Sequence, residues 1–200
     1  MLHLPGLLLL LLLVSACATT GPGAIDSPDW QAHSARLQAL QQWRASGKLA
    51  LRDPERAESA ILDWHQDGAQ TRVHLRGPLG VGATRIVSDG RQLEIQRDGE
   101  VRVIDISSRD QVRLHTGWDL PLGALPYWLR GRPDPSLEVE ALQLDAAGTL
   151  PRELSQAGWR ISYEDFADAG GLPLPSRLHI ESGATRATVV IRQWRTGSAT

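Results

Sequence analysis

Residues 59–76 read SAILDWHQDGAQTRVHLR, and this stretch decides the fold of the chain. Apolar and polar residues alternate on both sides of Asp67-Gly68, as they do in strands with one buried face. Asp-Gly between two such runs predicts a two-residue hairpin turn, because that turn needs positive φ angles. The turn would set these cross-strand pairs: Gln66 with Ala69, Trp64 with Thr71, Leu62 with Val73, and Ala60 with Leu75. Turn and pattern therefore predict one antiparallel pair with one apolar face.

The same pattern continues toward the C-terminus as an antiparallel meander. Two more Asp-Gly turns, at 89–90 and 98–99, predict strands at 83–88, 91–97 and 100–106. The second turn would set Leu93 opposite Ile104, but Val101 and Val103 would point to the other face. The pattern therefore does not decide which face is buried. Further strands are expected at 48–52, 137–144, 159–166, 177–181 and 186–194. One antiparallel sheet of ten or eleven strands must curl.

A helix is expected before the first strand. Ser27 can cap it, Pro28 suits its first position, and Gly47 would end it. Its apolar stripe comprises Trp30, His33, Leu37, Leu40 and Trp43. The helix could lie on a membrane, but its polar face carries few cations, which favours packing on the domain.

Two shorter helices are expected between the two runs of strands. The first would carry Val112, Leu114 and Trp118 and end near Gly117. The second would run from Pro121 to Gly131, with Pro126 in its first turn, where N–H groups lack partners anyway. Its apolar side would comprise Leu122, Leu125, Trp128 and Leu129. The economical arrangement is a strongly curved sheet whose concave face is covered by helices.

The N-terminus carries the pattern of a bacterial lipoprotein signal. An apolar run at 7–14 leads into Ser15-Ala16-Cys17, and it is shorter than the roughly 20 residues of a membrane-spanning helix. We expect residues 1–16 to be removed, Cys17 to be lipidated, 17–26 to form a flexible tether, 27–196 to form one domain and 197–200 a tail. The alternative is an ordinary secretory signal that leaves Cys17 as a free thiol.

Composition and motifs argue against most kinds of chemistry. The 200 residues carry a net charge of −2, so the chain has no excess of positive charge that would attract nucleic acid. No phosphate-binding glycine loop, GxSxG or HExxH occurs, and the histidines are scattered, so neither an enzyme nor a metal site is expected. Cys17 is the only cysteine, and seven tryptophans suggest a large apolar interior or an apolar cavity. A hydrolase with a dispersed site remains an alternative.

One loop stands apart from the sheet pattern. It reads Gly77-Pro78-Leu79-Gly80-Val81-Gly82 and places Leu79 at the tip of a turn. A single exposed leucine is common in soluble proteins. Inserted into lipid it would gain about 1.5–3 kcal/mol, too little to anchor the protein but enough to orient a tethered domain on a membrane.

The chain resembles the LolB family, outer-membrane receptors that accept lipoproteins from a periplasmic carrier and insert them into the membrane. The resemblance covers residues 17–194 and rests on motifs in fixed order: Leu40-Gln41-Gln42-Trp43 with Gly47, Leu62-Asp63-Trp64-His65-Gln66, Gly77-Pro78-Leu79-Gly80, Thr116-Gly117-Trp118-Asp119-Leu120-Pro121-Leu122, Leu125-Pro126-Tyr127-Trp128-Leu129-Arg130-Gly131, Gly158-Trp159-Arg160-Ile161-Ser162-Tyr163, Leu174-Pro175 and Trp194. It implies an unclosed half-barrel of about eleven antiparallel strands, covered by about three helices that enclose an apolar cavity.

The resemblance also implies the partners. A LolA-like carrier would deliver client lipoproteins, whose acyl chains enter the cavity before insertion into the inner leaflet of the outer membrane. The protein would be a monomer facing the periplasm, with no cofactor apart from diacylglycerol and an N-acyl chain on Cys17. Pro78, Leu79 and Gly80 would form the loop that meets the membrane. The cavity would be lined by Leu49, Leu51, Leu62, Trp64, Val73, Leu75, Trp128, Trp159, Ile161 and Tyr163. The alternative is a structural or assembly lipoprotein whose curved sheet binds protein partners.

Overall fold

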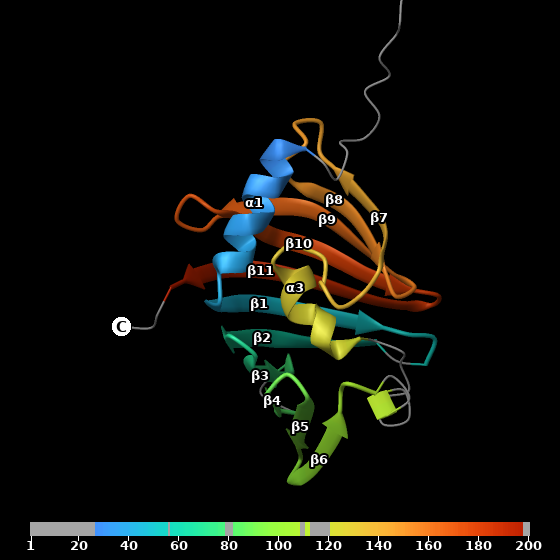
Figure 1. Ribbon diagram of the computed structural model, residues 1–200. Helices are drawn as coiled ribbons and strands as arrows, with labels where there is room; N and C mark the ends of the chain where they lie inside the picture. Colours follow the sequence, from blue (N-terminus) through green and yellow to red (C-terminus); the bar gives the residue numbers. More distant parts are fainter. Residues whose placement is uncertain (1–26, 56, 79–81, 109–110, 113–120, 198–200) are drawn as a thin grey trace, which may run out of the picture.

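The computed structural model describes residues 27–55, 57–78, 82–108, 111–112 and 121–197, and these form one curled antiparallel sheet with helices on its inner side (Figure 1). Helix α1 (Pro28–Ala39) precedes the sheet, and η2 (Leu122–Ala124) and α3 (Leu125–Leu129) separate its two halves. The strands are β1 (Gln42–Arg52), β2 (Ala57–Asp67), β3 (Gln70–Arg76), β4 (Thr84–Ser88), β5 (Gln92–Arg97), β6 (Glu100–Asp105), β7 (Val139–Leu144), β8 (Pro151–Gln156), β9 (Trp159–Asp168), β10 (Pro173–Ser182) and β11 (Thr185–Thr196).

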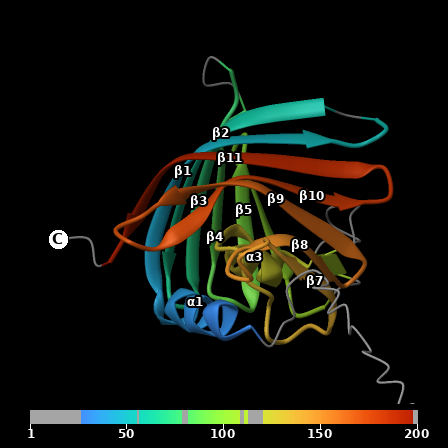
Figure 2. The same cartoon turned by 90° about the horizontal axis from the view of Figure 1, so that it is seen from above.

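The eleven strands follow the order β6-β5-β4-β3-β2-β1-β11-β10-β9-β8-β7. Each half is a meander of chain neighbours, and the first and last strands join the halves in the middle. The edge strands β6 and β7 do not pair with each other, so the sheet curls without closing (Figure 2). The predicted class, a mainly β protein with a single unclosed antiparallel sheet, is confirmed.

The first hairpin is offset by two residues from its predicted register. Asp67 pairs with Gln70, and Trp64 pairs with Val73, so the loop consists of Gly68 and Ala69. The predicted pairs were wrong because Gly68, with φ of +55°, takes the first loop position, while Asp67 still belongs to the strand. A shift of two residues keeps every side chain on its predicted face.

The third Asp-Gly hairpin follows its predicted register. Leu93 pairs with Ile104, around a loop in which Asp98 and Gly99 have φ of 51° and 84°. Both positive angles are what a type I′ turn requires. The structure also settles which face is buried, since Leu93 and Ile104 are enclosed while Val101 and Val103 are each 55% exposed.

The predicted end of the first helix was wrong. Helix α1 starts at Pro28 as expected, without a side-chain bond from Ser27, but it ends at Ala39, and Trp43 lies in β1. Gly47 serves a different purpose, because a Cβ atom there would lie 2.0 Å from the carbonyl oxygen of Val190 at a bulge between β1 and β11. Glycine at this position permits close approach of two strands.

The third predicted helix is confirmed as η2 followed by α3. Pro126 lies in the first turn of α3, and Gly131, with φ of 81°, follows its end. Only residues 111–112 of the second predicted helix are described, and they are helical, whereas Leu114, Gly117 and Trp118 lie outside the described residues.

Strand β8 was not predicted, because it starts with Pro151 and alternates through polar side chains that hide the period of two. Proline is tolerated there because the first residue of a strand can do without its N–H. The predicted start of the next-to-last strand, at residue 177, is also wrong, since β10 begins at Pro173.

The main core lies between α3 and the inner face of the sheet, and includes Trp43, Trp64, Trp128 and Trp159. A second cluster joins α1 to β10 through Leu37, Leu172 and Leu174. Five described tryptophans are buried, so most of them hold the domain together by packing.

Candidate functional site

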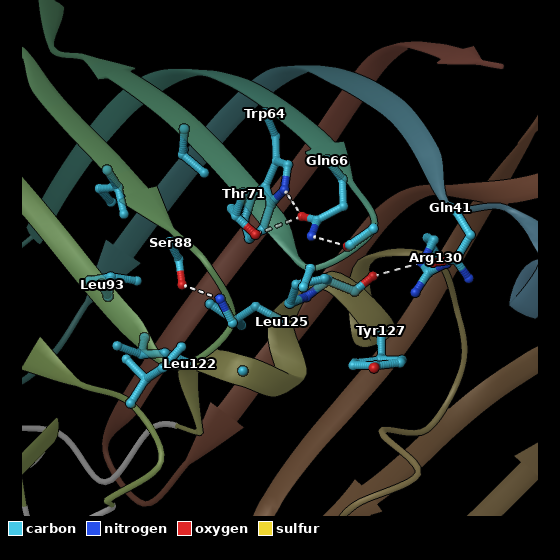
Figure 3. A pocket seen from close by; sticks show the side chains of 18 of the residues that line it. Gln41, Trp64, Gln66, Thr71, Ser88, Leu93, Leu122, Leu125, Tyr127 and Arg130 are labelled. Carbon is cyan, nitrogen blue, oxygen red and sulfur yellow. Dashed lines mark hydrogen bonds between the residues drawn. The ribbon is translucent and has the colours of Figure 1, made fainter. Parts of the chain in front are cut away.

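A cavity of about 760 Å³ lies between the inner face of the sheet, the segment from η2 to α3, and the end of α1 (Figure 3). Its strand side is lined by Leu49, Leu62, Trp64, Val73, Leu75, Ile86, Leu93 and Ile95, and its helix side by Leu122, Leu125, Pro126 and Tyr127. Its polar lining consists of Gln38, Gln41, Gln66, Thr71, Ser88, Arg130 and Arg132. The volume falls within the range of about 300–1,000 Å³ that is typical of small-molecule sites.

The strand wall follows from the alternation in β2 and β3. Leu62 pairs with Leu75 and Trp64 with Val73, so the apolar members of both strands share one face. The residues between them, such as Asp63 and Arg72, are exposed on the other face.

The polar groups in this wall are satisfied within it. The Gln66 Oε1 atom accepts hydrogen bonds from Trp64 Nε1, at 2.9 Å, and from Thr71 Oγ1, at 2.8 Å. Gln66 Nε2 donates to the carbonyl oxygen of Gly68 at 2.9 Å. Because these atoms are paired, they do not require partners from a ligand, and the wall can accept an apolar one.

Helix α3 is fixed to the second half of the sheet. Trp128 Nε1 donates to Gln156 Oε1 at 2.9 Å, and the Tyr163 hydroxyl donates to the carbonyl oxygen of Trp128 at 3.0 Å. Burial raises the pKa of Tyr163, so its hydroxyl remains a donor at any physiological pH. The helix wall of the cavity is therefore anchored on β8 and β9.

Arg130 joins α3 to α1. Its Nη1 atom donates to the carbonyl oxygens of Leu37, at 3.0 Å, and Leu40, at 2.6 Å, and its Nε donates to that of Pro126, at 2.9 Å. These carbonyls include ones that the end of α1 leaves unpaired. Burial, followed by the charge of Arg132, lowers the pKa of Arg130 to about 10, so the guanidinium is still charged at neutral pH.

The structure brings half of the predicted cavity residues together. Leu49, Leu62, Trp64, Val73 and Leu75 line the cavity, and Leu51 does not. The other four, Trp128, Trp159, Ile161 and Tyr163, lie in the main core instead. The reason is that α3 packs directly on the β8–β9 half of the sheet, which leaves the cavity over β1–β5. Contact of any of the ten with acyl chains stays a prediction.

Sequence reasoning missed the cavity residues of β4 and β5, namely Ile86, Leu93 and Ile95. The alternation of Leu93 and Ile95 with polar residues was visible, but it did not decide which face is buried, and Ile86 is followed by another apolar residue, Val87. Leu93 and Ile95 belong to the face that the structure shows to be turned inward.

Several predicted site residues lie outside the described residues, namely Cys17, Leu79 and Gly80. Pro78 is described and exposed, just after the end of β3. In the described part of the chain, no three histidine, cysteine or carboxylate side chains gather as metal ligands would. Across the same ranges, every helix is too short or too polar to cross a membrane.

Comparison with known proteins shows which family the chain resembles in sequence. The model of the family described as outer membrane lipoprotein LolB matches residues 41–194. The outer-membrane lipoprotein LolB of Alkalilimnicola ehrlichii is 42% identical over 185 residues, which cover 92% of each chain. That of Cellvibrio japonicus is 35% identical, over 96% of this chain and 98% of its own.

A solved structure is similar in fold. The LolA-superfamily protein from Nitrosomonas europaea superposes with a TM-score of 0.55 over 86% of this chain and 95% of its own, at 10% identity. At that identity the likeness concerns the fold alone.

Proposed function

The chain belongs to the LolB family of outer-membrane lipoproteins, and from this premise we propose that it receives lipoproteins from a LolA-like periplasmic carrier by binding their acyl chains. It then inserts them into the inner leaflet of the outer membrane. Transfer involves no chemical reaction on the cargo.

The observation that carries this proposal is the lining of the cavity. Leucine, isoleucine and valine side chains of β1–β5 face those of η2 and α3 across a volume of about 760 Å³. Each buried methylene of an acyl chain is worth about 0.8 kcal/mol, so a lipoprotein cannot cross water unless its chains are shielded. A wall whose polar atoms are already paired supports such shielding.

The anchor of the receptor would be Cys17, carrying diacylglycerol and an N-acyl chain, with residues 18–26 as a tether. This keeps a monomeric domain on the periplasmic side, beside the membrane that accepts the cargo. A Cys17→Ala variant is expected to fold, to lose its membrane attachment and still to accept cargo.

Leu79, held between Pro78 and Gly80, would touch the bilayer and present the cargo. The segment leads from β3 to β4, two strands that line the cavity, so contact at the loop would bring the cavity close to the membrane surface.

The test uses a carrier loaded with a fluorescent lipoprotein, vesicles, and the receptor anchored in them. Leu79→Glu is expected to leave uptake from the carrier intact and to impair insertion. Val101→Glu is the matched control, because Val101 is an exposed apolar residue on β6, a strand that does not line the cavity. A wild-type receptor that takes nothing from the carrier would overturn the proposal, and loss of uptake in Leu79→Glu would remove the role of the loop.

The alternative, a structural lipoprotein whose curved sheet binds protein, predicts a polar and exposed concave face. The inner face instead carries buried apolar side chains, among them Leu62, Val73 and Ile104. This observation favours lipid over protein as the occupant of the concave side.

A further inference from the structure

Two arginines gather at one end of the cavity. The guanidinium carbons of Arg130 and Arg132 lie 5.4 Å and 5.7 Å from the centre of the Tyr127 ring, and all three residues line the cavity. Figure 3 shows Gln41, Arg130 and Tyr127 together on one side, while Leu93 and Leu122 lie on the other. The cavity therefore has a cationic end and an apolar end.

The two arginines are not equivalent. Arg130 is used by the backbone, because three carbonyl oxygens accept its hydrogen bonds. Arg132 is not, since its Nε atom is buried and has no hydrogen-bond partner in the described part of the chain.

Neither arginine forms a direct ion pair. Among the described residues, no carboxylate lies within ion-pair distance of Arg130 or Arg132, in contrast to Arg177 or Arg186 on the outer face. The carboxylate of Asp134 lies beyond ion-pair distance of Arg132, but its charge raises the pKa of Arg132 against a larger lowering by burial, and its Oδ1 atom accepts hydrogen bonds from the N–H and the hydroxyl of Ser136, at 2.9 Å and 2.8 Å. Two adjacent cations beside a single carboxylate leave this partly enclosed site with an excess of positive charge, which is costly unless a ligand supplies negative charge.

A phosphate group meets this requirement. Guanidinium groups bind phosphate through two parallel charged hydrogen bonds, and the Nε donor of Arg132 has no hydrogen-bond partner among the described residues. Because this end adjoins an apolar wall, the ligand must carry its phosphate beside hydrocarbon chains.

We infer that the cavity also binds a diacyl phospholipid of the surrounding membrane, with its phosphate against Arg132 and Tyr127 and its acyl chains along β2–β5. The inference rests on the proposed function, because it uses the same acyl-binding wall. A lipidated cysteine with an acylated amine is neutral, so the arginine pair distinguishes the membrane lipid from the cargo. A phospholipid would cover the apolar wall between two cargoes and be displaced when the next one enters.

The experiment compares two lipids with identical acyl chains, anionic phosphatidylglycerol and neutral diacylglycerol. The full chain, expressed with its own N-terminal segment and released from membranes in mild detergent, is incubated with both, and the bound lipid is counted by native mass spectrometry. The wild type is expected to prefer phosphatidylglycerol at least about tenfold, the effect of one charge-assisted hydrogen-bond pair. Arg132→Gln should abolish this preference. Arg132→Lys should retain part of it, because lysine keeps the charge but lacks the two parallel donors of the guanidinium group.

The matched control is Arg152→Gln. Arg152 is exposed on β8, where its Nη1 donates to the carbonyl oxygen of Glu164, so its loss should not change the preference. An equal preference in wild type and Arg132→Gln would overturn the inference. So would a wild type that takes up both lipids equally, a result that does not depend on whether a variant folds. A wild type that takes up neither lipid would contradict the proposed function as well. Equal uptake of both lipids would contradict only the phospholipid inference, so the two failures can be told apart.

Discussion

Replacing Gln156 by leucine should loosen the helix wall of the cavity from the sheet. Gln156 is fully buried on β8, and its amide makes four hydrogen bonds. Its Oε1 accepts from Trp128 Nε1 and from the N–H of Asp134, both at 2.9 Å, and its Nε2 donates to the carbonyl oxygens of Asp134, at 3.0 Å, and Leu137, at 3.1 Å. Leucine is of similar size and can replace none of them.

The expected loss follows from the number of bonds. A hydrogen bond contributes about 1 kcal/mol net, so four of them give about 4 kcal/mol of unfolding free energy. That is a large part of the roughly 5–15 kcal/mol by which such domains are stable. For a domain of this size the midpoint of thermal unfolding should fall by about 10 °C.

The assay is urea unfolding followed by tryptophan fluorescence, in a chain that also carries Cys17→Ala so that no membrane anchor interferes. Gln143→Leu is the matched control, because Gln143 is exposed on the adjacent strand β7 and should lose almost nothing. A loss below about 1 kcal/mol in Gln156→Leu would refute the reasoning, since it would mean that the four bonds are replaced or do not act together.

Two further predictions concern the fold. Gly47→Ala should destabilise the domain by about 3 kcal/mol or more in urea unfolding, because the added Cβ would lie 2.0 Å from the carbonyl oxygen of Val190. The control is Gly123→Ala, which should cost little because the added Cβ would meet no neighbouring atom within 4 Å. In the folded state, burial lowers the pKa of His33 below its ordinary value of 6.5. The unfolded chain therefore binds the proton more tightly, and the free energy of unfolding should decrease as pH drops below about 6.5. His33→Gln should flatten this dependence and exposed His74→Gln should not, and a profile unchanged by His33→Gln would contradict the assignment.

The sequence predicted those parts of the fold that depend on neighbouring residues. The register predicted from Asp98-Gly99 agrees with the structure. The buried faces of β2 and β3 were also predicted correctly, although the turn at Gly68 shifts the register of this pair by two residues. Five of the ten residues predicted for the cavity line it, and four of these five belong to β2 and β3.

Features that depend on distant strands could not be predicted in this way. Gly47 is required by Val190, more than a hundred positions along the chain, and so looked like a helix stop. Strand β8 was missed because the partners that satisfy Gln156 come from 128–137. Trp159 was assigned to the cavity because sequence periodicity identifies an inward face but not the helix that covers it.

The most direct test of the central claim is the affinity of the chain for a triacylated lipopeptide, measured by titration of its fluorescence. Leu75 lines the cavity, and the next residue, Arg76, is exposed on the opposite face of β3. If the cavity holds acyl chains, Leu75→Trp should fill part of it and weaken binding at least about tenfold, while Arg76→Trp should change the dissociation constant by less than about twofold. Equal affinities in the two variants, or a larger loss in Arg76→Trp, would contradict the assignment of this cavity as the lipid-binding site.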